Sequence, residues 1–311
     1  MLSKMLKFTK RKNILLEILL LLIILYFVTQ YFMMGNREGF ETESESEKPY
    51  SVKTNVNEIY DKFYSNIYDQ LLYDDKKNGF ELGKLIEETK PKKASAVFID
   101  LGSGTGIQSH QLQEMGYTVT GVDKSSDMVS FAKKHNPKGD YVQGDVTDVN
   151  TFPREHATHA MCLYFTIYYI QNKRGFFQNV FHWLRPGGYF ALHLVNRNMF
   201  DPILPPGNPL MFVNAQKYAK ERMTKTKVKF NNYTYQSNFI LDKENNKTQF
   251  VEDFIDKKGK RFRKHEHTLY MEHQRHILNL AKESGFIFVS KSDMITCQYE
   301  YQYLYILQKP F

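Results

Sequence analysis

A short apolar run over residues 97–99 leads into Asp100 and then into three glycines at alternate positions, Gly102, Gly104 and Gly106. This pattern predicts a buried strand that enters a tight turn, where the backbone can pass close to a ligand because glycine has no Cβ. The helix expected after such a turn presents free N–H groups at its start, which suit an anionic or polar ligand group. The segment therefore predicts a nucleotide-type binding site.

Two nucleotide-binding folds use turns of this kind. The dinucleotide fingerprint needs a third glycine three residues after the second, and Ile107 stands at that position. The acid directly before the loop is also unexplained by that fingerprint. Both features resemble the first motif of the class I S-adenosylmethionine (SAM)-dependent methyltransferases, over roughly residues 55–311. The resemblance implies SAM as the cofactor, and Ile107 disfavours the competing class, a nicotinamide-dependent oxidoreductase.

An acid also ends the second predicted strand, Tyr117–Val122, which is rich in β-branched residues. An acid in this place accepts hydrogen bonds from the ribose hydroxyls, and Asp123 lies near the expected offset of about 20 residues. Capping of the next helix is the alternative. The third predicted strand, Asp140–Gln143, leads to Asp145. The resemblance assigns Asp145 to the adenine amino group, with a turn aspartate as the alternative.

The fourth predicted strand, Thr158–Tyr164, ends beside the methyl donor in this family. The resemblance therefore implies that Leu163 and Tyr164 flank SAM. The complete set of predicted cofactor contacts is Asp100, Gly102, Ser103, Gly104, Gly106, Asp123, Lys124, Met128, Asp145, Val146, Leu163, Tyr164, Tyr60 and Tyr68.

The last two residues of this set lie on a predicted helix over Asn57–Leu72, whose apolar and aromatic residues repeat every four positions. Small-molecule methyltransferases often carry such a helix over SAM. Tyr60 and Tyr68 are therefore predicted lid residues, and plain docking of the helix on the sheet is the alternative.

A general base is needed only when the methyl acceptor has a proton to lose. The candidates are His193, toward the end of a predicted strand over Tyr189–Val195, and Tyr168. His193 could equally be a core histidine, and Tyr168 and Tyr169 could line the acceptor pocket or pack in the core. No metal-ligand spacing is evident, so the sequence predicts no metal site.

The predicted fold is α/β, a seven-stranded Rossmann-like methyltransferase sheet with helices on both faces. Arg185-Pro186-Gly187-Gly188 before the fifth strand is a frequent signature of the family. A helix over Tyr270–Ser284 and two terminal strands would complete the sheet. Residues 196–269 are far longer than an ordinary connection. They predict an antiparallel β insertion that caps the active site and selects the substrate.

Residues 1–54 are predicted to be separate from the catalytic domain. Residues 1–13 form a basic tail, and residues 14–34 are an apolar run long enough for a ~30 Å hydrocarbon core at ~1.5 Å per residue. No small-residue cleavage site follows, which predicts an uncleaved transmembrane signal anchor rather than a signal peptide or a surface helix. Residues 35–54 read as a flexible acidic linker. The basic flank predicts a single-pass membrane protein with a cytosolic N-terminus.

The composition bears on the size of the core, on disulfides and on charged partners. A hydrophobic content of 42% can build a large core, and two cysteines exclude a disulfide framework. The net charge of +8 includes basic clusters at Lys217–Lys229 and Lys257–Lys264, expected to be solvated faces, with nucleic-acid contact as the alternative. The predicted function is methyl transfer from SAM to an oxygen or nitrogen of a small molecule or lipid. The alternatives are a protein or RNA acceptor, or a catalytically silent SAM-binding, membrane-tethered module.

Overall fold

The computed structural model describes residues 14, 16–26, 49–207, 216 and 219–311. The chain divides into two units, residues 1–40 and 41–311. In the first unit, residues 16–26 are helical with exposed side chains. No helix among the described residues has the length and apolarity that a bilayer crossing requires. Most of the predicted tail, anchor and linker (1–13, 15 and 27–48) lies outside the described residues, so the anchor stays a prediction.

A seven-stranded sheet forms the centre of the second unit, in the order β11-β12-β6-β5-β2-β3-β4. Neighbouring strands from β6 to β4 are parallel, whereas β12 is antiparallel to both β6 and β11. This arrangement confirms the predicted fold class. The strands are β2 (Val97–Leu101), β3 (Thr118–Asp123), β4 (Asp140–Gln143), β5 (Ala157–Cys162), β6 (Leu184–Val195), β11 (Ile287–Asp293) and β12 (Gln302–Gln308).

Helices cover both faces of this sheet, which is why its central strands are continuous apolar runs. On β2, Phe98 packs in a cluster with α5 and α6, while its neighbour Ile99 packs on the opposite face with α9 and α10. Trp183 of α9 is fully buried in the second cluster. The helices are α5 (Asp75–Thr89), α6 (Ile107–Glu114), α7 (Ser126–His135), α9 (Lys173–Trp183) and α10 (Gln274–Glu283).

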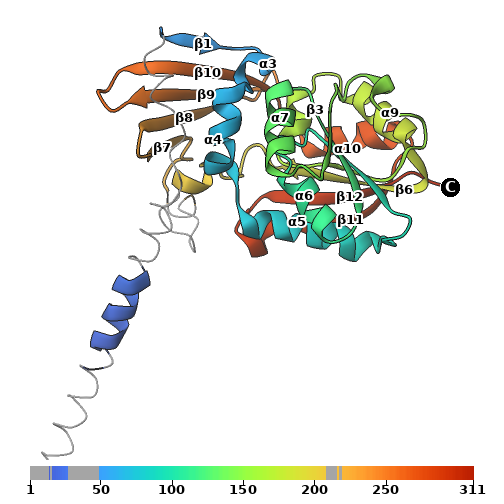
Figure 1. Cartoon of the computed structure of the whole chain (residues 1–311), viewed down its shortest axis with the longest axis horizontal. Coiled ribbons are helices and arrows are strands. Elements are labelled where there is room, and N and C mark those ends of the chain that lie inside the picture. Colours follow the sequence, from blue (N-terminus) through green and yellow to red (C-terminus); the bar gives the residue numbers. More distant parts are fainter. Residues whose placement is uncertain (1–13, 15, 27–48, 208–215, 217–218) are drawn as a thin grey trace, which may run out of the picture. The chain divides into compact units, whose positions relative to one another are not determined.

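The predicted insertion forms most of a second sheet, in the order β1-β10-β9-β8-β7 (Figure 1). Its strands are β1 (Ser51–Lys53), β7 (Lys225–Lys229), β8 (Tyr233–Asp242), β9 (Lys247–Asp256) and β10 (Arg261–Tyr270). Strands β7 to β10 are antiparallel neighbours, as predicted, whereas β1 pairs in parallel with β10. Because β1 falls inside the predicted flexible linker, the folded unit starts earlier than residue 55. Residues 208–215, 217 and 218, part of the insertion and of one basic cluster, lie outside the described residues.

The single helix predicted over Asn57–Leu72 is two helices, α3 (Val56–Ile59) and α4 (Lys62–Leu72). The break has a local cause, because the Asp61 side chain accepts a hydrogen bond from Tyr64 N and caps α4. Phe63 of α4 packs edge-on against Phe254 and Phe262 of the second sheet. The remaining elements are the short helix α8 (Thr166–Tyr169) and the 3₁₀ turns η1 (Val149–Thr151), η2 (Pro205–Gly207) and η4 (Met294–Cys297).

Candidate active site

A cavity of about 570 Å³ lies at the carboxyl ends of the parallel strands. Its lining comes from the glycine turn after β2, the segments after β3, β4 and β5, helix α4, and the strands β8 to β10 of the second sheet. Ligands of open α/β sheets bind at this end of the strands. A volume in this range suits a cofactor or a drug-sized molecule.

The glycine turn is built as the sequence predicts. Gly104 has φ +55° and its N–H donates to Asp123 Oδ2 at 2.9 Å, while a Cβ there would approach only Tyr68 Cε1, at 3.7 Å. Gly106 has φ +82°, and a Cβ there would lie 2.5 Å from Tyr141 Cε1. Gly104 therefore keeps the backbone accessible at the cavity, whereas Gly106 is required by the packing behind it.

Most of the predicted cofactor contacts line this space. The residues of the set that line the main cavity are Tyr60, Tyr68, Gly102, Gly104, Asp123, Lys124, Asp145, Val146 and Tyr164. A small adjoining recess of about 60 Å³ shares Tyr68, Gly102, Gly104 and Tyr164 and adds Asp100, Ser103 and Leu163. Gly106 and Met128 line neither space: Gly106 packs against Tyr141 behind the turn, and Met128 of α7 is buried against α4.

Three carboxylates around the turn differ in their surroundings. Burial raises the pKa of Asp100 to about 7, although Ser109 Oγ donates to it at 2.7 Å. Burial also raises the pKa of Asp123, opposed by hydrogen bonds from the backbone N–H groups of Ser125 and Gly104. Burial opposes the charge of Asp145, but the ammonium of Lys124 at 2.8 Å and the hydrogen bonds from Thr147 outweigh it and lower the pKa. The turn therefore combines backbone donors with acceptor oxygens, which suits a ribose and an amino group.

The two predicted general bases are not at the cavity. His193 is fully buried, with Nε2 3.0 Å from Gln302 Oε1 and Nδ1 2.8 Å from Glu81 Oε1. The Tyr168 hydroxyl oxygen is also buried and accepts a hydrogen bond from Val195 N at 2.8 Å. Neither residue lines the cavity, and this placement favours the alternative of a core role for both.

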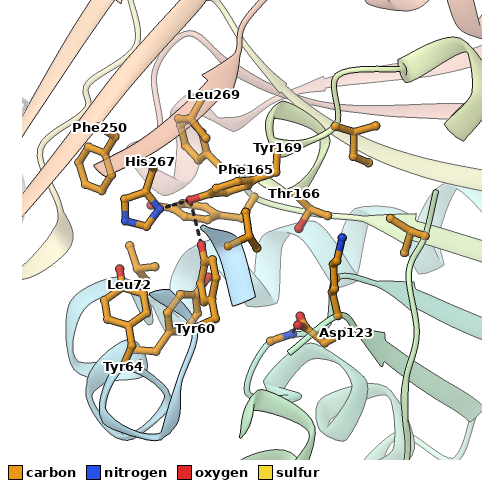
Figure 2. Close-up of a pocket in the computed structure, with 18 of the residues that line it drawn as sticks. Tyr60, Tyr64, Leu72, Asp123, Phe165, Thr166, Tyr169, Phe250, His267 and Leu269 are labelled. Atoms are coloured by element: carbon orange, nitrogen blue, oxygen red, sulfur yellow. Dashed lines mark hydrogen bonds between the residues drawn. The ribbon is translucent and has the colours of Figure 1, made fainter. Parts of the chain in front are cut away.

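A different set of titratable side chains reaches the cavity. The hydroxyl of Tyr60 is 2.9 Å from that of Tyr169, which is 2.8 Å from His267 Nδ1, as the dashed lines in Figure 2 mark. His267 Nε2 lies 2.8 Å from the fully buried carboxylate of Glu252. Tyr169 was predicted as a possible pocket residue, whereas His267 and Glu252 were not predicted from the sequence. The only sequence pattern that pointed to this group was the spacing of His265 and His267, which places both on one face of a strand. The sequence did not reveal that Glu252, on the neighbouring strand, lies against them.

Glu252, His265 and His267 also form the one group, among the described residues, whose potential metal-ligand atoms converge, all within 4.8 Å of one another. The spacing of these residues along the chain does not reveal the group, because Glu252 belongs to β9 and the two histidines belong to β10. In the structure both imidazoles form hydrogen bonds with the Glu252 carboxylate. Arg263 Nε donates to His265 Nε2 at 2.6 Å, so His265 Nδ1 carries the proton and donates to Glu252 at 2.9 Å.

Residues 99–192 of the chain match the family described as "Methyltransferase domain". The protein YqeM of Bacillus subtilis is 31% identical over 140 residues, which are 42% of this chain and 53% of that protein. Phosphoethanolamine N-methyltransferase 1 of Triticum aestivum is 34% identical over 115 residues, 35% of this chain and 23% of that protein. The chain thus spans about half, or less, of the curated relatives it matches.

Among solved structures, a SAM-dependent methyltransferase from Clostridium acetobutylicum has a similar fold, with a TM-score of 0.60 at 17% identity. The similarity covers 80% of this chain and 98% of that one. Three observations point to the same fold: the matched segment, the strand order of the central sheet, and the turn that combines Asp100 with the glycines. Residues 99–192 therefore match a methyltransferase family, and the second unit has the α/β fold of the SAM-dependent methyltransferases.

Proposed function

We propose that this protein is a SAM-dependent methyltransferase that acts on an oxygen or nitrogen atom of a small acceptor. The observation that carries the proposal is the turn at which Gly104 N and Asp123 meet on the cavity wall, 2.9 Å apart. An accessible glycine backbone beside a buried carboxylate fits the polar end and the ribose of one nucleoside ligand. Asp145 faces the same cavity and would accept from the adenine amino group.

When bound, SAM supplies an electrophilic methyl group on a sulfonium. The protein must then hold the acceptor atom in line with that methyl group and exclude water, since proximity and orientation provide most of the rate. Tyr68 and Tyr164 adjoin both the main cavity and the small recess. They would therefore pack against the cofactor, while the wall formed by Tyr169, Phe250 and Leu269 remains for the acceptor.

A small acceptor is favoured over a macromolecule because strands of the second sheet and helix α4 cover the cavity. The name of the wheat relative, a phosphoethanolamine N-methyltransferase, supports a small amine as one class of acceptor. A lipid acceptor would agree with the membrane anchor predicted over residues 14–34 and a cytosolic N-terminus. We infer this anchor from the apolar run and its basic flank, and carbonate extraction of the full chain from membranes tests it.

Calorimetric titration of the full chain with SAM, S-adenosylhomocysteine and NAD tests the cofactor. We expect micromolar binding of the first two and none of NAD. Binding of NAD alone would overturn the proposal. A screen of small amines and alcohols with radiolabelled SAM then tests transfer, and SAM binding without transfer to any acceptor, protein and RNA included, would favour the silent tethered module.

A further inference from the structure

A continuous line of hydrogen bonds runs from the cavity wall to a buried carboxylate. It begins at Tyr60, between α3 and α4, and passes through Tyr169 at the end of α8 and His267 on β10 to Glu252 on β9. Tyr60, Tyr169 and His267 line the cavity, and Glu252 does not. The path therefore joins the α3–α4 turn, α8 and the neighbouring strands β10 and β9, and its first three residues are labelled in Figure 2.

The direction of each proton along this path follows from the carboxylate. Glu252 Oε1 accepts from the hydroxyls of Tyr64 and Tyr235, at 2.8 and 2.6 Å, and Oε2 accepts from both histidines. An ionised carboxylate only accepts, so His267 Nε2 must carry a proton. In the neutral imidazole Nδ1 is then an acceptor. Tyr169 donates to it, Tyr60 donates to Tyr169, and the oxygen of Tyr60 keeps a lone pair for a group in the cavity.

Glu252 is held in its ionised form. Burial opposes its charge, but the positive charge that His267 can carry and the hydrogen bonds from His265 and His267 lower the pKa of Glu252 well below its ordinary value. A buried carboxylate in contact with an imidazole stabilises the imidazolium that forms when the ring takes a proton. The titratable groups that surround His267 are Glu252, His265, Tyr60, Tyr64 and Tyr169.

We propose that this path is the proton acceptor of the methyl transfer and that the substrate is therefore an amine or hydroxyl compound whose reacting atom carries a proton. The inference rests on the proposed function. The bond from methyl carbon to sulfur breaks as the bond from methyl carbon to the acceptor forms, and its electron pair stays on sulfur as a thioether. The acceptor proton passes to Tyr60 oxygen, the Tyr60 proton to Tyr169, and the Tyr169 proton to His267 Nδ1.

The charges on the cavity wall agree with such a substrate. Among the described residues that line the cavity, Lys124 is the only lysine or arginine, and it pairs with Asp145 at the cofactor end. Tyr60 touches the acceptor in this scheme, whereas Tyr169, His267 and Glu252 act through it. Substitution of Tyr169, His267 or Glu252 should therefore leave SAM binding intact.

Nuclear magnetic resonance of the full chain labelled with ¹⁵N-histidine tests the path without any acceptor. We expect Nε2 of His267 to carry a proton, because Glu252 accepts a hydrogen bond from it, and His265 to be neutral with its proton on Nδ1. Tyr169→Phe should shift the Nδ1 signal of His267 and leave that of His265 in place. A proton on Nδ1 of neutral His267 would overturn the proposal, and so would displacement of both imidazole protons by added Zn²⁺, because that result assigns the cluster to a metal.

Turnover separates this role from a structural one. With radiolabelled SAM and an amine that the acceptor screen has identified, Tyr169→Phe should lower kcat by about 100-fold or more and alter the limb of the pH profile that reports the base. Tyr168→Phe is the matched control, since it removes the hydroxyl of the adjacent buried tyrosine on the same helix, and it should leave kcat within about threefold. Equal losses in the two variants would contradict the path. Failure of the wild-type chain to bind SAM would remove the proposed function and leave the tautomer result standing.

Discussion

The sharpest test of the core concerns the buried ion pair on α5. Lys77 Nζ lies 2.8 Å from Glu81 Oε2, and the two side chains are only 3% and 0% exposed. Glu81→Gln keeps an acceptor oxygen for Lys77 but removes the charge that compensates the buried ammonium. Loss of one partner of a buried pair costs about 3–5 kcal/mol. We therefore expect urea unfolding at pH 7 to give a free energy of unfolding lower by about that amount.

The pKa of Glu81 gives a value for the net stabilisation of its charge by all of its surroundings. Burial opposes its charge, but the charge of Lys77 and the hydrogen bond from His193 lower the pKa from 4.5 to about 2. This fall corresponds to about 3 kcal/mol. Because the pKa is lower in the folded state, the contribution is complete above about pH 4.5 and is lost as the pH falls toward 2. Stability of the wild type should fall through this range more steeply than that of Glu81→Gln.

The same helix offers a control. Lys84 and Glu87 form a pair at 2.6 Å, but their side chains are 33% and 64% exposed, so solvent screens their attraction. Glu87→Gln should therefore cost a small fraction of the loss in Glu81→Gln. Lys77→Met combined with Glu81→Gln should recover most of the stability, since neither position of this pair then carries a buried charge. Similar losses for Glu81→Gln and Glu87→Gln would refute the reasoning.

Other predictions concern the glycine turn. Gly104→Ala should cost about 1 kcal/mol of stability for its left-handed backbone and weaken SAM binding at least tenfold by calorimetry. Gly106→Ala should cost about 2–4 kcal/mol in urea unfolding, because its Cβ collides with Tyr141; equal thermal shifts in the two variants would argue against this assignment. Asp123→Asn should weaken SAM binding about 10- to 100-fold, through loss of charge-assisted bonds to the ribose, and unchanged affinity would remove its assigned role. Asp100→Asn should raise the free energy of unfolding at pH 8 by about 4 kcal/mol relative to the wild type, because the pKa of Asp100 is raised from 3.8 to about 7. The difference should shrink as the pH falls below 7 and disappear only near pH 3.8, and a difference independent of pH would contradict burial of the charge.

The central sheet could be predicted from the sequence because its evidence is local. Apolar runs such as Val97–Leu101 identify buried strands, and the glycines after them identify the turn. Asp123 followed from its position at the end of a strand. These residues lie within one βαβ unit, whose geometry is nearly fixed once its elements are recognised.

The acceptor side could not be predicted in the same way, because it depends on pairing between distant strands. His265 lies directly opposite Glu252 only through the register of β9 and β10. His193 has a chemically suitable side chain, and periodicity does not reveal that α5 brings Glu81 against it. The break between α3 and α4 had a visible signal, the capping residue Asp61, but the aromatic period continued through it.

Strand β1 has a practical consequence for how the domain is handled. Its three residues, Ser51–Lys53, pair with Arg263–His265, which end two residues before His267 in the same strand. A recombinant fragment that begins at residue 55 would turn β10 into a bare sheet edge, open to pairing with other chains. It would also loosen the strand that holds His267. Fragments meant for crystallisation or assay should therefore include β1, and an inactive or aggregating shorter fragment says nothing about the chemistry of the intact chain.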